Sequence, residues 1–280
     1  MNPSRIALAI AVASAALALS GAARADSLGD IMASNNEVGI ASISQNINYS
    51  ELDSLQSFGG PSLDSEQGSP GGYAFTVSVD KDLWSTNNYL ALGYSSTSGT
   101  TNYTGGVMSG SGTYTPLSAI SGARTSDYYA RVGTTFIPGD HTMVTPYLEY
   151  GNHTWDRNVG QSTSFGYAET YTHDYAGAGM LLQFAPVDKL VLTADLFMGT
   201  MLNASISAAS LGTQSMTDPN MLTRIGVGLD YRLWHDIHLT LGFDQVQYSY
   251  SGSAVSSTGF LEPPSNTTLQ VTSIGLAYGF

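Results

Sequence analysis

Residues 224–233 read Arg-Ile-Gly-Val-Gly-Leu-Asp-Tyr-Arg-Leu, and this stretch decides the fold class. Apolar residues at positions 225, 227, 229, 231 and 233 alternate with glycine or charged residues at positions 224, 226, 228, 230 and 232. Successive side chains of a β-strand point to opposite faces, so this alternation predicts a strand with one apolar and one polar face.

The same alternation recurs along the chain, at residues 73–80, 128–136, 176–184, 190–202 and 237–244. A first strand over 38–49 is less regular, because Ile40 and Ile43 differ in phase. Short turns alternate with long segments rich in Ser, Thr, Gly and Asn. The short turns lie at 81–84, 138–140, 186–189 and 234–236, and the long segments at about 51–71, 97–124, 154–169, 202–220 and 251–266. This order predicts about ten antiparallel strands, with eight or twelve as alternatives.

The composition excludes several classes of protein. The 280 residues include no cysteine, which removes disulfides, thiolate catalysis and cysteine-based metal sites. A net charge of −13 argues against binding to nucleic acid. Only 11% of the residues are charged, against roughly 25% in an average soluble domain. Strands that turn one face to lipid would account for this low charge.

The N-terminal 25 residues predict a secretory signal peptide. Arg5 precedes an apolar run over 6–19, and Ala23-Arg24-Ala25 offers small residues at the cleavage spacing. No later stretch has the 18 consecutive apolar residues of a transmembrane helix. We therefore expect a signal peptide over 1–25, a periplasmic lead over 26–36 and one domain over 37–280.

A soluble sandwich could show the same alternation, since parity does not tell which face turns to water. The signal peptide, the strand lengths, the aromatic residues near strand ends and the alternation of short with long connections favour a membrane barrel. Lipid also demands closure, because an open sheet edge would leave backbone groups without partners. The predicted fold is an all-β, transmembrane, antiparallel up-and-down β-barrel.

The last eight residues, Ser273-Ile274-Gly275-Leu276-Ala277-Tyr278-Gly279-Phe280, resemble the terminal strand of bacterial outer-membrane barrels. The resemblance rests on Ser273, Gly275, Tyr278 and Phe280, and it implies recognition of this strand by the barrel assembly machinery. Residues 153–157 and 169–175 are similar to a group of bacterial barrels described only as outer membrane proteins, which brings no established activity. The implied location is the outer membrane of a Gram-negative bacterium, with its lipids as partners.

The charged residues on the inward faces of the strands suggest how the lumen is filled. By parity the lumen receives Arg131, Glu149, Asp195, Arg224, Asp230, Arg232 and Asp244. Buried ions are costly unless paired, and a barrel of about ten strands lies near the size that side chains fill. We therefore expect an ion-pair network that largely plugs the lumen, and a structural or surface-interaction role. A small porin-like solute channel is the alternative.

An enzyme of the omptin or lipid A deacylase kind is less favoured. Asp236-Ile237-His238 falls in a turn expected at the periplasmic end, whereas the catalytic pairs of omptins lie at the outer end. His153 and His173-Asp174, with Glu149 or Glu169, are more readily interpreted as rim and lumen residues. Asp53, Asp64 and Glu66 offer carboxylates for calcium at the cell surface, but they show no regular ligand spacing, so a solvated loop is the favoured interpretation. We expect no catalytic, cofactor or metal site. Tyr103, Tyr114, Tyr167 and Tyr171 offer contacts to a surface ligand, but stacking among themselves or an aromatic girdle at the membrane rim is the preferred interpretation.

Overall fold

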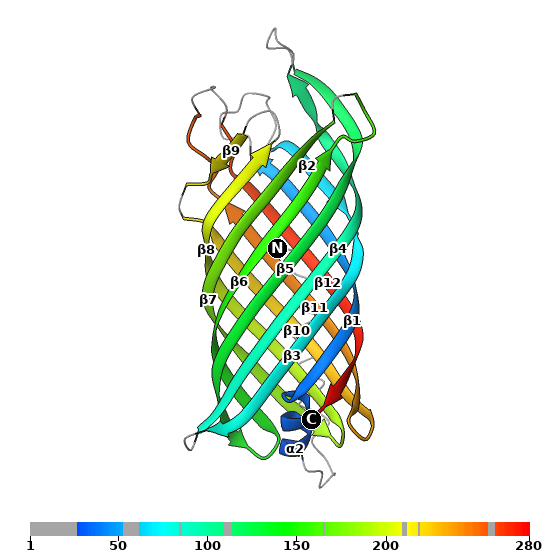
Figure 1. Ribbon diagram of the computed structural model, residues 1–280, viewed down its shortest axis with the longest axis vertical. Helices are drawn as coiled ribbons and strands as arrows, with labels where there is room; N and C mark the ends of the chain where they lie inside the picture. Colours follow the sequence, from blue (N-terminus) through cyan, green and yellow to red (C-terminus); the bar gives the residue numbers. More distant parts are fainter. Residues whose placement is uncertain are drawn as a thin grey trace.

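A computed structural model describes residues 27–52, 62–83, 86–108, 114–164, 166–208, 212–217, 219–256 and 261–280. The predicted signal peptide over 1–25 and Asp53 lie outside these residues, and so does the side chain of Tyr114. The described part is an antiparallel sheet rolled into a tilted-strand barrel, with one short helix at one end (Figure 1).

The elements follow the chain in the order α2 (Ser27–Ser34), β1 (Glu37–Leu52), β2 (Ser62–Gly68), β3 (Gly71–Leu83), β4 (Thr86–Met108), β5 (Tyr114–Gly139), β6 (Thr142–Val159), β7 (Tyr167–Val187), β8 (Leu190–Ala208), β9 (Gly212–Ser215), β10 (Met221–Trp234), β11 (Ile237–Tyr250) and β12 (Ser265–Gly279). Ten of these strands form a continuous hydrogen-bonded ring in the described structure, since β1 pairs with both β3 and β12, and β10 pairs with both β8 and β11. The predicted antiparallel barrel of ten strands is confirmed.

The two ends of the barrel differ. Tight connections join β3 to β4, β5 to β6, β7 to β8 and β10 to β11 at the lower end in Figure 1, which also carries α2 and the C-terminus. We call it the turn end, and the opposite end the loop end. The short strands β2 and β9 lie at the loop end, where β2 pairs with β1 and β4, and β9 pairs with β8.

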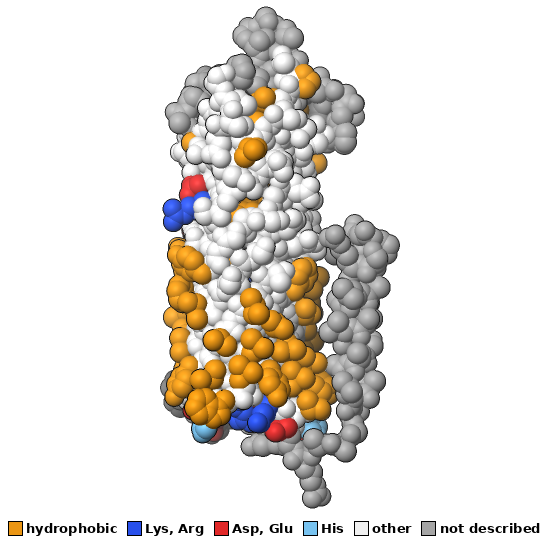
Figure 2. All heavy atoms as spheres, turned by 90° about the vertical axis from the view of Figure 1, so that its right-hand side faces the viewer, with side chains coloured by type: hydrophobic (Ala, Val, Ile, Leu, Met, Phe, Trp, Pro, Cys, Tyr) orange, Lys and Arg blue, Asp and Glu red, His pale blue; other side chains and the backbone are white. Residues whose placement is uncertain are grey.

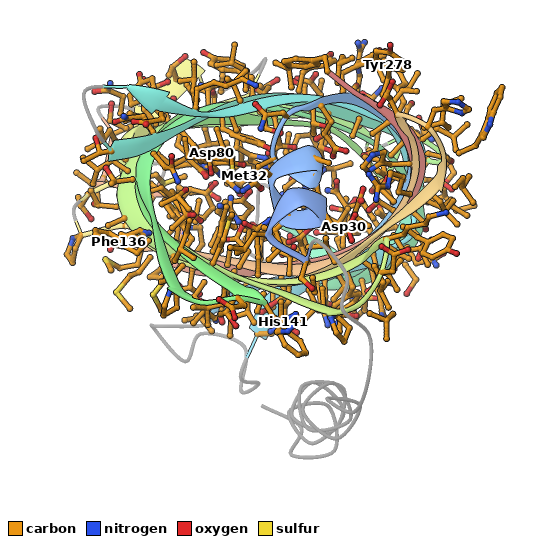
Figure 3. The ribbon with its side chains drawn as sticks, turned by 90° about the horizontal axis from the view of Figure 1, so that it is seen from below. Asp30, Met32, Asp80, Phe136, His141 and Tyr278 are labelled. Carbon is orange, nitrogen blue, oxygen red and sulfur yellow. The ribbon has the colours of Figure 1, made fainter. Side chains whose placement is uncertain are left out.

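The helix α2 lies inside the ring at the turn end, as the view along the barrel shows (Figure 3). Its Ile31 is fully buried and packs with Met143, Ala185 and Val191 from the barrel wall. Among the described residues, no helix has the length and hydrophobicity needed to cross a membrane.

The outer surface changes character along the barrel, and β6 shows where. Near the turn end its outward residues are apolar, at Val144, Pro146, Leu148 and Tyr150; toward the loop end they become polar, at Asn152, Thr154, Asp156 and Asn158. Figure 2 shows the apolar side chains gathered over the turn-end half, with a largely uncharged surface beyond them. A lipid bilayer matches the apolar half and water matches the polar half.

The strands run further than the sequence pattern predicts. β4 has 23 residues and β5 has 26, and they pair over most of the segment 97–124 that the sequence suggests is a loop. Ser, Thr and Gly are common in this segment because both its faces lie beyond the apolar band, so the alternation of apolar and polar residues is lost while the hydrogen-bonded ribbon continues.

Candidate functional site

In the described part of the chain, charged and polar side chains from many strands converge in the lumen, which is filled in layers. The first layer, at the turn end, is α2 with its contacts. Asp30 accepts a hydrogen bond from Arg232 Nη2 at 2.6 Å and another from the Lys189 backbone N–H at 2.8 Å. Asn35, just after the helix, donates to Asp80 at 3.2 Å and to Gln183 at 3.0 Å. The helix is therefore bound to opposite sides of the wall.

A cavity of about 250 Å³ lies between α2 and the middle of the barrel. Asn35 and Glu37 line it from the helix side, and Arg131, Asp195 and Asp244 line it from above. Glycines at 226, 228 and 242 form part of its wall, and their missing side chains leave room for the cavity.

The second layer is an ion-pair network that crosses the lumen. Arg131 pairs with Glu149, and its Nη2 lies 3.1 Å from Asp195 Oδ2; Arg224 lies 2.8 Å from Glu149 Oε2 and 3.3 Å from Asp195 Oδ2. Each arginine thus contacts both carboxylates, and the four residues come from the four strands β5, β6, β8 and β10. The hydroxyls of Tyr147 and Tyr175 donate to Asp195 and Glu149. Such mutual pairing is what buried ions require.

The predicted network of seven residues is divided in the structure. Arg131, Glu149, Asp195 and Arg224 come together, and Asp244 lies beside Asp195 but forms no ion pair among the described residues, whereas Asp230 and Arg232 lie elsewhere. Arg232 pairs with Asp30 of α2, Asp230 is 2.6 Å from His238 Nδ1, and Asp244 lines the cavity. All seven face the lumen as parity requires, but Asp230 and Arg232 lie nearer the turn end than the network does.

The third layer fills the loop-end half with aromatic side chains. Tyr49 packs edge-on against Trp155 at 5.3 Å between ring centroids, and Tyr171 stacks on Trp155 at 5.8 Å. Arg157 lies over the Tyr49 ring and pairs with Glu66 at 2.7 Å and Glu169 at 2.9 Å. Above the apolar band the interior is therefore built like that of a soluble protein, with an apolar and aromatic core.

Carboxylates at the loop end outnumber their cationic partner. Glu262, in the connection between β11 and β12, accepts a hydrogen bond from Tyr171, and burial raises the pKa of its carboxyl to about 7. Burial likewise raises the pKa of Asp64 in β2 to about 6, against the opposing effect of Arg157. These two groups differ from the paired carboxylates of the second layer, since neither forms a direct ion pair within the described residues.

The histidines considered for catalysis are buried in the wall of the aromatic layer. His153 Nδ1 lies 2.6 Å from Asp127 Oδ1, and His153 is stacked on Tyr248 with 4.7 Å between centroids. His173 bonds to the Tyr250 hydroxyl, and its neighbour Asp174 accepts hydrogen bonds from Asn152 and Asn203 on the outer side. His153 and His173 are 2% and 1% exposed, so substrate has no direct access to either ring.

Ser273, Gly275 and Tyr278 of the terminal-strand pattern lie on β12, which closes the ring between β11 and β1, and Phe280 follows directly after this strand. Tyr278 and Phe280 are more than half exposed and lie on the outer surface; Figure 3 shows Tyr278 pointing outward. A side chain at Gly275 would meet the Ile40 carbonyl oxygen at 2.5 Å, so only glycine fits there. Recognition by an assembly machinery stays a prediction.

Comparison with known proteins supports the fold. No family model and no curated protein matches the sequence. The outer membrane protease OmpT from Escherichia coli matches in structure with a TM-score of 0.54 at 9% identity, over 88% of this chain and 97% of OmpT. The translocator domain of the autotransporter NalP from Neisseria meningitidis gives a TM-score of 0.42 at 12% identity, over 96% and 98% of the two chains. The attachment invasion locus protein Ail of Yersinia pestis gives 0.34 at 11%, over 88% and 99%. The match to OmpT shows that the chain has the fold of the bacterial outer-membrane β-barrels.

Proposed function

We propose that this protein is a closed, non-conducting barrel of the Gram-negative outer membrane that carries a rigid polar surface outside the cell, in a structural or surface-interaction role. The turn end would face the periplasm. The observation that carries the proposal is the network of Arg131, Glu149, Asp195 and Arg224, which spans the lumen between two further filled layers.

A channel would need a continuous water path through all three layers. The helix α2 occupies the turn end, the network has no unpaired arginine, and the aromatic layer buries Tyr49, Tyr171 and Ile206 almost completely. In planar bilayers we expect the folded protein to give only background current. Stable single-channel steps from the wild-type protein would reject the closed barrel and favour the solute channel.

The polar surface would be presented by the extended β4–β5 ribbon and the loop-end half of the other strands. This half carries Ser, Thr and Asn outward, as at Asn152 and Thr154, and is suited to hydrogen-bonding partners rather than to lipid. The proposed partners are outer-membrane lipids around the apolar band, the assembly machinery during insertion and a surface ligand at the loop end.

Cysteine labelling of intact cells tests the location and the orientation, because the chain contains no cysteine of its own. Ser118→Cys lies on the exposed side of β5 at the loop end, and Asp140→Cys lies in the β5–β6 turn. We expect a membrane-impermeant maleimide to label the first variant on intact cells and the second only after permeabilisation. The reverse pattern would contradict the orientation.

The enzyme alternative is not favoured by the geometry. Asp127 and His153 do form a close pair, but the rings of Tyr248 and His173 pack against the His153 imidazole, which is buried. We therefore propose no catalytic role for this protein.

A further inference from the structure

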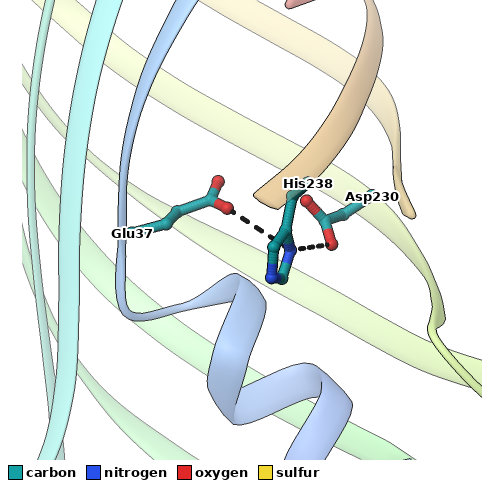
Figure 4. Close-up of side chains that lie close together, drawn as sticks. All are labelled: Glu37, Asp230 and His238. Atoms are coloured by element: carbon teal, nitrogen blue, oxygen red, sulfur yellow. Dashed lines mark hydrogen bonds and ion pairs between the residues drawn. The ribbon is translucent and has the colours of Figure 1, made fainter. Parts of the chain in front are cut away.

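Three ionisable side chains from three strands converge at the turn end: Glu37 of β1, Asp230 of β10 and His238 of β11 (Figure 4). One ligand atom of each lies within 4.8 Å of the other two. His238 Nδ1 is 2.6 Å from Asp230 Oδ1 and 3.8 Å from Glu37 Oε2.

The barrel closure brings these residues together. β12 lies between β11 and β1, with Ala277 opposite His238 and Gly279 opposite Glu37. Both of these β12 residues are small, and a Cβ atom at position 279 would lie 3.5 Å from His238 Nε2. The side chains of Glu37 and His238 therefore reach each other across β12, although no spacing in the sequence joins them.

The cluster has more negative charge and more polar atoms than its neighbours satisfy. Within the described residues, the ion-pair partner of Glu37 and of Asp230 is His238 alone, since Arg232 is engaged by Asp30. Buried atoms without a hydrogen-bond partner include Glu37 Oε2, Asp230 Oδ2 and His238 Nε2. Unsatisfied buried polar atoms are rare in folded proteins, and several at one place call for a water molecule or an ion to satisfy them.

We propose that Glu37, Asp230 and His238 form a binding site for a divalent transition-metal ion, with zinc as the reference metal. One imidazole and two carboxylates are common ligands of such ions. Ligand atoms about 2.1 Å from a tetrahedral metal lie about 3.4 Å apart, so the ion requires only small side-chain rotations. The ion takes the place of the Nδ1 proton between His238 and Asp230, and this proton moves to Nε2, so that a neutral imidazole, two carboxylates and a divalent cation make the buried cluster neutral.

The surroundings complete the site. Glu37 and Asp230 both line the cavity of about 250 Å³ beneath the central network, from which water can supply the remaining ligands. Glu37 also follows α2 directly along the chain. A bound ion would connect β1 to the β10–β11 hairpin and fix the first layer of the lumen in place.

Metal analysis of the folded full-length mature protein tests the site. The protein in detergent is stripped with a chelator, equilibrated with Zn²⁺ and freed of unbound metal. We expect about one zinc per chain for the wild type and a loss to below about a tenth for Glu37→Gln and His238→Gln. His235→Gln, which changes an exposed histidine in the adjacent turn, is the matched control and keeps its zinc.

Heat-modifiable mobility on gels verifies that each variant is folded. Co²⁺ added to the wild type provides an independent readout, since its coordination by His238 Nδ1 and two carboxylates gives visible d–d absorption. This absorption should disappear when Zn²⁺ displaces the bound Co²⁺. Absence of both stoichiometric zinc and the cobalt band in the wild type would overturn the proposal. Undiminished zinc in folded Glu37→Gln and His238→Gln would overturn it equally.

Discussion

At the scale of single residues, the partner of a buried carboxylate decides its behaviour. Glu149 and Asp195 each contact two arginines, whereas Glu262 is held by the Tyr171 hydroxyl and Asp64 lies near Arg157 without a direct ion pair. Burial disfavours a charge that is not compensated. The pKa of the Glu262 carboxyl is accordingly raised to about 7.

This raised pKa predicts a pH dependence of stability. Between its ordinary pKa of 4.5 and about 7, Glu262 keeps in the folded state a proton that the unfolded chain has released. The contribution of the protonated Glu262 carboxyl to the stability of the folded state is therefore fully present at low pH and is lost as the pH rises through about 7. We expect Glu262→Gln to raise the free energy of unfolding at about pH 8, by the order of 1–3 kcal/mol, with little change at about pH 4. Urea unfolding in detergent, followed by tryptophan fluorescence, measures both values.

Asp188→Asn is the control, because Asp188 is an exposed carboxylate in the β7–β8 turn. It should follow the wild-type pH profile. A Glu262→Gln variant that is less stable than the wild type at about pH 8 would mean that the charged carboxylate stabilises the loop end.

The sequence alone predicts which side chains face the lumen, but it does not predict which of them contact one another. Alternation correctly turns Arg131, Asp195 and Arg232 inward, because parity needs only the order of residues along one strand. Which of them meet depends on the register between strands, and Arg232 lies too near the turn end to join the network. The cluster of Glu37, Asp230 and His238 was missed for the same reason: the expectation of no metal site rested on sequence spacing, whereas barrel closure joins these strands.

At the scale of elements, α2 shows how the context creates a helix. Residues 26–36 were expected only as a periplasmic lead, and an isolated helix of eight residues is not stable in water. Here the burial of Ile31 against Met143 and Val191, and the bonds from Asp30 to Arg232 and Lys189, stabilise it. None of these partners is close to it in the sequence.

The plug role of α2 can be tested with Val191→Cys, which introduces a thiol beneath Ile31 at a position that is 1% exposed. In the intact chain the thiol should be protected from a small methanethiosulfonate reagent. Deletion of residues 27–34 should raise its reaction rate by at least about tenfold, because the covering layer is gone. Ile206→Cys, buried in the aromatic layer, should stay protected in both backgrounds. Equal reactivity of Val191→Cys with and without the helix would contradict the plug.

At the scale of the whole molecule, the barrel is adapted to two solvents. Its turn-end half is apolar outside with the ion-pair network inside, and its loop-end half is polar outside with aromatic side chains around Arg157 inside, while β1 and β6 each keep one unbroken alternation of faces. This explains the conflict in the first strand: Ile40 is exposed in the apolar band, whereas Ile43 is buried in the lumen above it. The sequence pattern predicts the barrel because all ten strands of the ring alternate apolar and polar residues in the turn-end half. It does not predict the change of the outer surface from apolar to polar, because alternation does not show which face turns to lipid or to water.

Because the outer surface changes from apolar to polar along β6, the same substitution should change the stability of the protein differently at two positions on this strand. Leu148 is 62% exposed within the apolar band, and Asn158 is exposed on the same face near the loop end. An arginine at 148 would sit in hydrocarbon and should lower the free energy of unfolding by about 2–4 kcal/mol. An arginine at 158 would sit in water and should change it by less than about 0.5 kcal/mol. Denaturant titration of the two variants in lipid vesicles measures both effects, and similar costs at 148 and 158 would mean that the membrane does not end between Tyr150 and Asn152.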